Sequence, residues 1–286
     1  MRILFLTPAP DYPEDWQWAY EPQSRPLLAR GAEVETLAWS DAQDLGGYDL
    51  ILPLICWGYH LRFAEWMAFV DQLERERLPV VNPPALLRWN SDKAYLAELP
   101  SKGVSTVPSI NADACSDSDL DEARERFGRR ELVVKPPISA GAHGTYRLQA
   151  GDLLPADLNG ERVIIQPMID SVVSKGEYSL ILFDGVLSHS VVKRPKAGDF
   201  RVQPHLGGIT AACEPPVGGE ALAHAALAAA PAHATYARID MVESADGELM
   251  IMEMELVEPA LFLAEAPHGS DAFADAIVSA AQRPRK

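Results

Sequence analysis

The sequence predicts an α/β protein in which a parallel sheet at the N-terminus is followed by a region rich in hairpins. Short apolar runs alternate with helical stretches from residue 3 to residue 81, which is the pattern of β-α-β units. After the turn sequence Asn-Pro-Pro at 82–84, strands dominate and hairpin turn signals appear. At 286 residues, the chain is long enough for two or three small domains.

The N-terminal elements follow from the apolar runs and their breakers. The first strand is a continuous apolar run, as expected of a strand buried on both faces, and Gly31 ends the first helix. After the first strand the chain reads Thr-Pro-Ala-Pro and not Gly-x-Gly-x-x-Gly, so a dinucleotide site and an NAD-dependent oxidoreductase are disfavoured. The expected order is a strand at 3–6, a helix at 23–29, strands at 33–37 and 50–54, a helix at 61–76 and a strand at 79–81.

The later elements are a capped helix and a series of strands. Asn90 or Ser91 can cap a helix that begins at residue 92. Asp184-Gly185 has the composition of a tight hairpin turn. The expected order is a helix at 92–99, strands at 132–134, 162–166, 177–183 and 186–192, a helix at 220–230, paired strands at 236–243 and 248–255, and a helix at 271–281.

Composition excludes several classes of function. The chain carries 25 basic and 41 acidic side chains, a formal net charge of −16, which disfavours non-specific binding to nucleic acid or anionic lipid. The cysteines Cys56, Cys115 and Cys213 show neither zinc-site spacing nor a disulfide framework, as in a reducing compartment. No apolar run approaches the roughly 20 residues that span a bilayer, and the N-terminal run is too short for a signal peptide. We therefore expect a soluble, cytoplasmic protein.

The second hairpin concentrates acidic residues on one face. Side chains alternate along a strand, and directly opposed residues share a face. A four-residue loop at 244–247 would set Arg238 opposite Glu253 and Asp240 opposite Ile251. The charged residues that then point the same way are Arg238, Asp240, Glu253 and Glu255. The methionines expected to point into the other layer are Met250, Met252 and Met254.

Three carboxylates on one sheet face repel one another unless a cation lies among them. Hard oxygen ligands of this kind suit Mg2+, which usually also takes phosphate oxygens. The alternative is a solvated acidic face that Arg238 screens, since charged strand faces commonly meet water.

A buried strand ends in Lys135 and is followed by a stretch of small residues at 138–145. Small residues let backbone N–H groups approach phosphate closely, and the lysine supplies a point charge. The stretch is not a Walker A loop, because no Gly-Lys-Ser/Thr follows the glycines. A surface loop with an exposed lysine remains the alternative, and Lys93 is equally ambiguous by itself.

Four cations fall within nine residues of this acidic chain: Lys193, Arg194, Lys196 and Arg201. They indicate either an anionic ligand, such as a carboxylate or phosphate, or local charge balance. Structural roles are preferred for His143, His189 and His205, because none is expected beside a nucleophile or a His/Cys partner. Ser139 is not in a Gly-x-Ser-x-Gly elbow, so serine hydrolysis has little support.

Taken in order, these features resemble the ATP-grasp superfamily. The order is a small α/β domain, Asn-Ser-Asp-Lys, Val-Val-Lys-Pro with a Gly-rich flap, Gln-Pro-Met, Gly-Glu-Tyr-Ser-Leu, and finally Arg-Ile-Asp with Met-Glu-Met-Glu. The resemblance covers nearly the whole chain and is closest to glutathione synthetase, D-alanine–D-alanine ligase and related carboxylate–amine ligases. Among subgroups, the chain is most similar to the cyclo-ligase that closes O-ureido-D-serine to cycloserine.

The resemblance implies a nucleotide site. Lys93 and Lys135 would hold the ATP phosphates. The flap from Ser139 to Thr145, with Gly141 and Gly144, would close over them.

The resemblance also implies how adenosine is held. Gln166 to Met168 would be the hinge beside adenine, with Gln166 or the Met168 backbone contacting the base. Glu177 matches the acidic residue that the family uses on ribose.

The family's metal ligands match Asp240, Glu253 and Glu255, and would bind Mg2+ or Mn2+. The last ligand is usually asparagine, so Glu255 departs from the family pattern. Arg238 matches an arginine that steadies the acyl phosphate and the tetrahedral intermediate. The basic positions near the transferred phosphate and the substrate carboxylate match Arg194 and Arg201.

Together the resemblance implies an α+β ATP-grasp fold of three units: an N-terminal α/β domain at 1–88, a lid subdomain at 89–166 and a C-terminal subdomain at 167–286. The implied function is a C–N bond-forming ligase of amino-acid or antibiotic biosynthesis, acting on a small carboxylate and an amine. The alternative is a nucleotide-binding regulatory or assembly protein that keeps the fold without ligase turnover. The sequence leaves the acceptor and the oligomeric state open, a homo-oligomer included.

Overall fold

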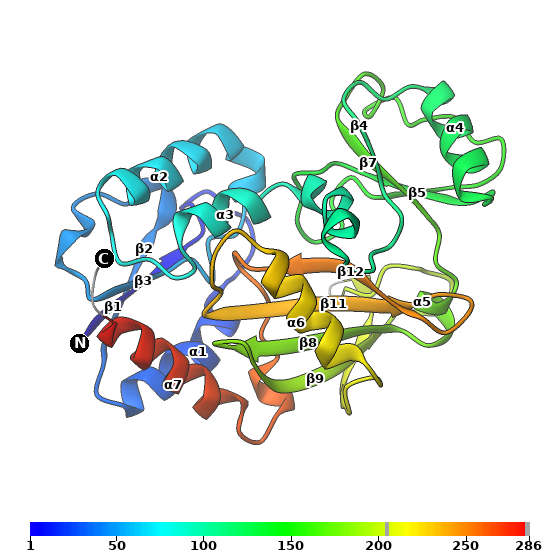
Figure 1. Ribbon diagram of the computed structural model, residues 1–286. Helices are drawn as coiled ribbons and strands as arrows, with labels where there is room; N and C mark the ends of the chain where they lie inside the picture. Colours follow the sequence, from blue (N-terminus) through cyan, green and yellow to red (C-terminus); the bar gives the residue numbers. More distant parts are fainter. Residues whose placement is uncertain (204–205, 284–286) are drawn as a thin grey trace.

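The computed structural model describes residues 1–203 and 206–283, and within these residues it contains three sheets (Figure 1). Sheet A is parallel, with the order β2-β1-β3, as predicted for the N-terminal region. Its strands are β1 (Arg2–Thr7), β2 (Glu33–Ala38) and β3 (Leu50–Leu52). Its helices are α1 (Gln17–Ala29), α2 (Phe63–Arg75), α3 (Pro84–Asn90) and the C-terminal α7 (Gly269–Gln282).

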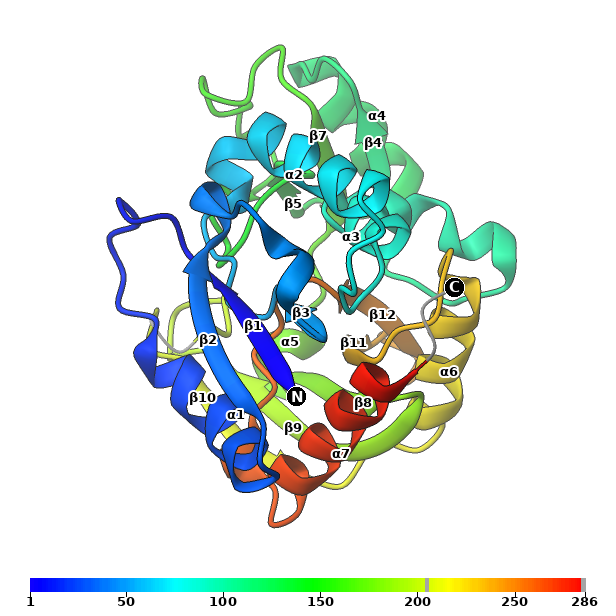
Figure 2. The same ribbon diagram turned by 90° about the vertical axis from the view of Figure 1, so that its left-hand side faces the viewer.

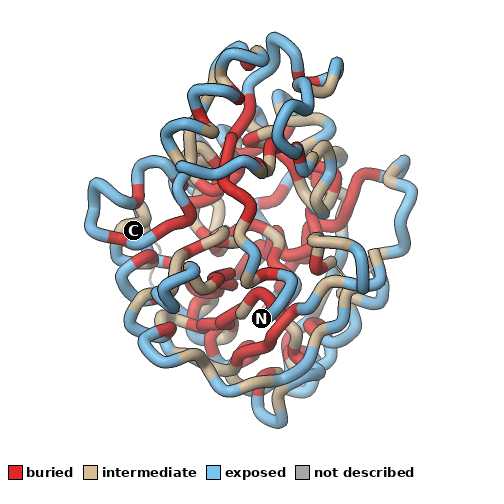
Figure 3. The backbone as a smooth tube through the Cα atoms, turned by 90° about the vertical axis from the view of Figure 1, so that its right-hand side faces the viewer, coloured by how far each residue is buried: buried red, intermediate tan, exposed pale blue. Residues whose placement is uncertain are grey.

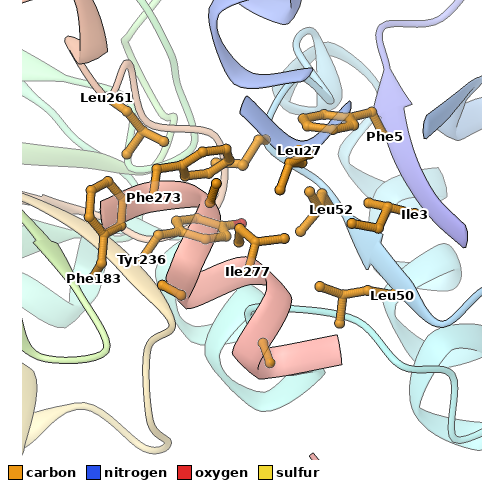
Figure 4. Packing of buried hydrophobic residues seen from close by; sticks show 14 of the residues in the cluster. Ile3, Phe5, Leu27, Leu50, Leu52, Phe183, Tyr236, Leu261, Phe273 and Ile277 are labelled. Atoms are coloured by element: carbon orange, nitrogen blue, oxygen red, sulfur yellow. The ribbon is translucent and has the colours of Figure 1, made fainter. Parts of the chain in front are cut away.

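Alternate residues of β1 pack into two different cores, which is why the strand is a continuous apolar run. Ile3 and Phe5 point toward α1 and α7, where they meet Leu27, Phe273 and Ile277 (Figure 4). The residues between them point to the opposite side, among α2 and α3. Figure 2 shows α1 and α7 side by side on one face of sheet A. Helix α7, at the end of the subdomain expected at 167–286, therefore packs against the N-terminal α/β domain.

Sheet C is a four-stranded antiparallel sheet with the order β4-β7-β5-β6. Helix α4 (Asp117–Phe127) covers one face, where Leu132, Val134 and Ile165 are buried. Alternation turns Lys135 toward the opposite face. The strands are β4 (Ile110–Ala112), β5 (Leu132–Lys135), β6 (Tyr146–Leu148) and β7 (Val163–Pro167).

Sheet B has the order β10-β9-β8-β11-β12, and all its neighbouring strands are antiparallel. Helix α6 (Gly219–Ala229) packs against its apolar face, over Leu180, Ile239 and Met241. Figure 1 places sheet C beyond the β12 edge of this sheet. The strands are β8 (Glu177–Phe183), β9 (Val186–Arg194), β10 (Ile209–Cys213), β11 (Tyr236–Glu243) and β12 (Leu249–Glu255).

The remaining elements are one short α-helix and several 3-10 turns. They are α5 (Ser171–Ser174), η1 (Trp39–Asp41), η2 (Leu45–Gly47), η3 (Tyr59–Arg62), η4 (Lys93–Ala97), η5 (Leu99–Lys102) and η7 (Leu263–Glu265). Figure 3 shows the buried backbone running through the middle of the molecule, with exposed loops around it. Within the described ranges, no helix has both the length and the apolar character that crossing a membrane requires.

The predicted register of the β11–β12 hairpin was wrong, because a β-bulge lies next to Asp240. Arg238 pairs with Glu255 rather than Glu253, and Asp240 pairs with Glu253 rather than Ile251. Beyond the bulge the register changes by one residue, which exchanges the faces of the strand.

The predicted placement of the three methionines was consequently wrong for two of them. Met254 does pack with Ile239 in the core under α6. Met250 and Met252 lie instead in a small cluster with Val242 on the other side of the sheet.

The helix expected at 92–99 is two 3-10 turns, η4 and η5, and its predicted caps were wrong. Asp92 is the cap, since its Oδ1 accepts a hydrogen bond of 2.9 Å from the Ala94 amide. Asn90 instead bonds the backbone of β12, and Ser91 donates to the Leu87 carbonyl.

Asn82 joins the N-terminal domain to sheet B. It is fully buried, donates to the carbonyls of Tyr236 (2.9 Å) and Leu256 (2.8 Å), and accepts from the Thr235 amide (2.7 Å). Asn82→Ala would leave these three backbone groups without their partner, so we expect the free energy of unfolding to fall by about 3 kcal/mol.

Urea denaturation measures this effect. The matched control is Asn111→Ala, since Asn111 is exposed and makes one 3.2 Å side-chain bond. A variant Asn82→Ala as stable as this control would contradict the proposed link between the domains.

Candidate active site

The face of sheet B opposite α6 carries a group of polar and charged side chains, which we call the charged face. On it, Asp240 lies between Ser179 of β8 and Glu253 of β12. Arg238 is paired with Glu255 in the next row. A third row pairs residues of β8 and β9. The members of the charged face are Glu177, Ser179, Lys193, Arg238, Asp240, Glu253 and Glu255.

Asp240 is the centre of the charged face. Its carboxylate accepts hydrogen bonds from Arg238 Nη2 (3.0 Å), Lys193 Nζ (3.1 Å) and Ser179 Oγ (2.5 Å). Burial alone would raise the pKa of Asp240, but Arg238 and Lys193 outweigh burial and hold this pKa below its ordinary value. Asp240 is therefore a permanent anion at the middle of the site.

Lys193 is the member of the basic cluster that points into the site. Its Nζ lies 2.5 Å from Glu177 Oε1, and both side chains are buried. Burial raises the pKa of Glu177, and the nearby Lys193 opposes that rise. Arg194, the next residue, is exposed because alternation turns it to the other face. Glu177, expected at ribose, is thus held by Lys193.

Two lysines approach the charged face from other elements. Lys93 Nζ lies 3.2 Å from Glu253 Oε1 and also donates to the Ser139 carbonyl of the flap. Lys135 is buried, and burial lowers its pKa while Glu253 raises it. The structure therefore brings together Lys93, Lys135, the flap and Glu253.

The flap at 139–145 turns twice through left-handed backbone. Gly141, Ala142 and Gly144 have φ values of +60°, +63° and +66°. A Cβ on Gly144 would also lie 2.9 Å from Pro136 Cγ, so glycine is required there.

The expectation that His143 lies beside no histidine was wrong. The centroid of the His143 ring in the flap lies 6.0 Å from the centroid of the His60 ring in η3. The flap therefore reaches the N-terminal domain. His189 has the expected structural role, since its Nε2 is 2.9 Å from the Leu261 carbonyl oxygen. His205 lies outside the described residues.

The expected adenine hinge is buried at the end of β7. Gln166 Nε2 donates to Ser109 Oγ at 2.9 Å. The Met168 amide donates to the Glu131 carbonyl at 3.0 Å. Of the two backbone groups of Met168, the carbonyl would therefore be the one that contacts adenine.

Arg201 and Arg194 are not brought to the other site residues. The Arg201 guanidinium holds Asp199, two residues away, through bonds of 2.9 and 3.1 Å from Nη2 and Nε. This pairing keeps the pKa of Asp199 well below its usual range. Of the three basic candidates, Arg238 alone contacts the carboxylates of the charged face among the described residues.

The carboxylates of the charged face fit a magnesium ion by their chemistry. Burial raises the pKa of Glu255 to about 7; Arg238 opposes this rise, and repulsion by Glu253 and Asp240 adds to it. The face is therefore richer in negative charge than its own cations neutralise, and its donors are hard oxygens. Within 1–203 and 206–283, no three His, Cys, Asp or Glu side chains are arranged around one metal position. Instead, Glu253 forms an ion pair with Lys93, and Glu255 forms one with Arg238. To bind the metal, the two carboxylates would give up these ion pairs.

Sequence reasoning named Lys193 only as a member of the basic cluster and did not place it beside Asp240 and Glu177. The two-residue turn at 184–185 would set Val192 opposite Glu177. A bulge between Ile181 and Leu182 shifts this register by one residue and puts Lys193 there instead. Ser179 was also missed, since only the pairing of β8 with β11 brings it to Asp240.

Known proteins share this architecture. Residues 3–82 match the N-terminal domain family of D-cycloserine synthetase DcsG. The cycloserine biosynthesis protein DcsG of Streptomyces lavendulae is 33% identical over 266 residues, which cover 86% of this chain and 88% of that protein. A crystal structure of D-cycloserine synthetase DcsG is 29% identical, with a TM-score of 0.85 over 99% of this chain and 100% of that one.

More distant structures support the fold. D-alanine–D-alanine ligase from Bacillus anthracis is 21% identical, with a TM-score of 0.70 over 100% of this chain and 98% of that one. The ATP-grasp ligase PsnB is 18% identical, with a TM-score of 0.64 over 97% and 99% of the two chains. The predicted fold class is thereby confirmed. The chain belongs to the family of the D-cycloserine synthetase DcsG, within the ATP-grasp ligases.

Proposed function

We propose that the protein is an ATP-dependent cyclo-ligase that activates the carboxylate of O-ureido-D-serine as an acyl phosphate and closes it to cycloserine. The observation that carries this proposal is the convergence of Lys93, Lys135 and Arg238 on the carboxylates of the charged face. These cations come from η4, sheet C and sheet B, and the nucleotide would lie where these three parts of the chain meet. Membership in the DcsG family supports the choice of substrate.

The reaction has two steps. A carboxylate oxygen of the substrate attacks the γ-phosphorus of ATP, and the bond to the ADP oxygen breaks. The nitrogen nucleophile of the same molecule then attacks the acyl carbon and releases its proton to solvent, and inorganic phosphate leaves with the electron pair of the broken C–O bond. The carbamoyl group that remains on the ring nitrogen after these two steps is hydrolysed, and its loss as CO2 and NH3 gives cycloserine. Both steps shift negative charge between oxygens, so fixed cations are the main requirement.

The side chains of this protein supply those cations. Lys93 and Lys135 would bind phosphate oxygens, and the flap would cover them. Arg238, held by Asp240 and Glu255, would face the oxygen of the tetrahedral intermediate. Mg2+ held by Asp240, Glu253 and Glu255 would neutralise phosphate charge, and Mn2+, which accepts the same oxygen ligands, should replace it.

The nucleoside and the substrate carboxylate have their own candidates. Gln166 and the Met168 carbonyl would contact adenine. Glu177 would contact ribose, and it would give up its ion pair with Lys193 to do so. Arg194 and Arg201 remain candidates for the substrate carboxylate, and Arg201 would have to release Asp199 to reach it.

The test is turnover. The protein is incubated with ATP, Mg2+ and O-ureido-D-serine, and then with a panel of other amino acids. We expect ADP and phosphate release with O-ureido-D-serine, with cycloserine detected by mass spectrometry. ATP binding without turnover on any of these compounds would instead favour a regulatory nucleotide-binding protein.

A further inference from the structure

Glu258 is an acidic side chain without a partner at the junction of two domains. It lies three residues after β12 and is half-buried. Among the residues that the structure describes, it makes no hydrogen bond and no ion pair. A carboxylate taken partly out of water normally requires a cation or a donor.

The backbone that carries Glu258 is fixed on both sides. The Leu256 amide donates to Asn90 Oδ1 (2.7 Å), and Tyr236 Oη donates to the Val257 carbonyl (2.8 Å). The side chain of Val257 then packs in the core under α2, and Leu261 packs in the core under α7. Figure 1 shows this orange segment passing from sheet B toward the N-terminal domain. Glu258 is therefore held in place between the two domains.

Glu258 faces the carboxyl edge of sheet A. It lies close enough to raise the pKa values of Tyr12, which follows β1, and of Cys56 and Tyr59, which follow β3; burial is the larger cause for each. In the order β2-β1-β3, the chain passes from β1 to β2 on one side, while β3 lies on the other side of β1. The segments that follow β1 and β3 therefore leave the sheet toward opposite sides. Open α/β sheets bind ligands at such a crevice.

The loops at this edge contact each other through aromatic side chains. The Tyr12 ring packs directly on Gly58, where a Cβ would lie only 2.7 Å from Tyr12 Cδ2. Trp18, near the start of α1, and Trp57, next to Gly58, also meet, with ring centroids 5.5 Å apart and ring planes tilted by 40°. Aromatic rings are thus gathered at the edge of sheet A that lies near Glu258.

The cations of the charged face are already used by other carboxylates. Lys93 pairs with Glu253, Arg238 with Asp240 and Glu255, and Lys193 with Glu177 and Asp240. Burial raises the pKa of Glu258 to about 8, and Glu255 adds to this rise while Lys93 and Arg238 oppose it. Among the described residues, Glu258 thus forms no ion pair, and an ammonium group of a ligand would supply the positive charge that favours its ionised form.

Glu258 is also near the reacting groups. Three residues span at most about 10 Å between the Cα atoms of Glu255 and Glu258. The segment then folds back over Arg238, whose Nη1 donates to the Ala260 carbonyl at 3.3 Å. A substrate whose carboxylate lies near Arg238 can therefore extend a neighbouring group to Glu258.

We propose that Glu258 binds the α-ammonium group of the substrate and makes the enzyme select amino acids over carboxylic acids that lack this group. This inference rests on the proposed function, because it takes the substrate carboxylate to be the group activated at Arg238. An amino acid carries its ammonium and carboxylate on one carbon, which matches the short separation of the two sites.

Kinetics with two compounds tests the proposal. The first is O-ureido-D-serine, and the second is 3-(ureidooxy)propanoic acid, in which hydrogen replaces the amino group. We expect the parent protein to favour the first roughly a hundredfold in kcat/KM, the scale of a lost buried charge pair. Glu258→Gln should lose this preference, mainly through a higher KM for the amino compound, and should turn over the second compound about as well as the parent.

The controls separate recognition from structure. Glu265→Gln alters an exposed acid seven residues further along and should keep the parental preference. Glu258→Gln should keep or raise the melting temperature, since it removes a carboxylate from like-charged neighbours. A retained preference in Glu258→Gln, or an equal loss with both compounds, would overturn the proposal.

A failure of the proposed function would be recognised separately. If the parent releases no phosphate with either compound, the ligase assignment fails. Calorimetric binding of the two compounds to the parent and to Glu258→Gln then decides the inference. Tighter binding of the amino compound that Glu258→Gln abolishes would support it, and binding indifferent to the amino group, or no binding, would refute it.

Discussion

Asp240→Asn is expected to lower turnover at least roughly a thousandfold and to destabilise the protein by about 3 kcal/mol. The substitution leaves Arg238 and Lys193 buried with a neutral partner in place of the anion that both contact. It also replaces a charged carboxylate proposed as a metal ligand with a neutral amide, which keeps one oxygen but binds Mg2+ less strongly. Turnover is measured as ADP release, and stability by urea denaturation.

The matched control is Asp246→Asn, which changes an exposed residue in the turn between β11 and β12. This control should leave both quantities unchanged. If Asp240→Asn kept parental turnover, Asp240 would be a structural member of an ion-pair network and not part of the active site.

Glu253→Ala is expected to reduce turnover at least roughly a hundredfold while changing stability little. Glu253 is about a fifth exposed, at 22%, and its one ion pair among the described residues joins Lys93, which keeps its bond to the Ser139 carbonyl. Mg2+ with ATP should raise the melting temperature of the parent much more than that of the variant. Glu248→Ala, in the exposed turn of the same hairpin, is the control.

Near-parental turnover in Glu253→Ala would exclude it as a metal ligand. A thermal shift with ATP that is indifferent to Mg2+ would have the same meaning. The effect on stability separates this variant from Asp240→Asn, since Glu253 supports far fewer contacts.

Glu255→Asn is the gentler companion substitution. It introduces the residue that the wider family usually has at this position, and asparagine keeps one oxygen ligand. Most of the turnover should therefore survive, measured by the same ADP assay. A loss as large as that of Glu253→Ala would mean that Glu255 acts through its charge, by holding Arg238.

The charged face could be predicted from strand alternation even though the register was wrong. At Arg238 and Asp240 the true pairing with β12 differs from the predicted pairing by two residues. A shift of two residues leaves every side chain on the same face of the sheet. Beyond the bulge the difference is one residue, which is why Met250 lies on the opposite face from the one predicted. The bulge itself has no signal in the residues around Met252.

The remainder of the site depends on tertiary contacts. Lys193 enters the site because of a second bulge, and Glu258 meets the N-terminal domain only when the chain crosses from sheet B to sheet A. Short strands such as β4 and β6, of three residues each, carry too little periodicity to be predicted. The long apolar strands and the C-terminal helix were predictable, because burial on two faces or one stripe determines their composition.

The central claim is that the substrate carboxylate is activated as an acyl phosphate at the charged face. It is tested most directly with O-ureido-D-serine labelled with oxygen-18 in its carboxylate, incubated with unlabelled ATP and Mg2+. The carboxylate oxygen that attacks the γ-phosphorus leaves with the phosphate when the nitrogen displaces it. We therefore expect one oxygen-18 atom in each phosphate released together with cycloserine, seen by mass spectrometry. Unlabelled phosphate accompanying product formation would contradict the account.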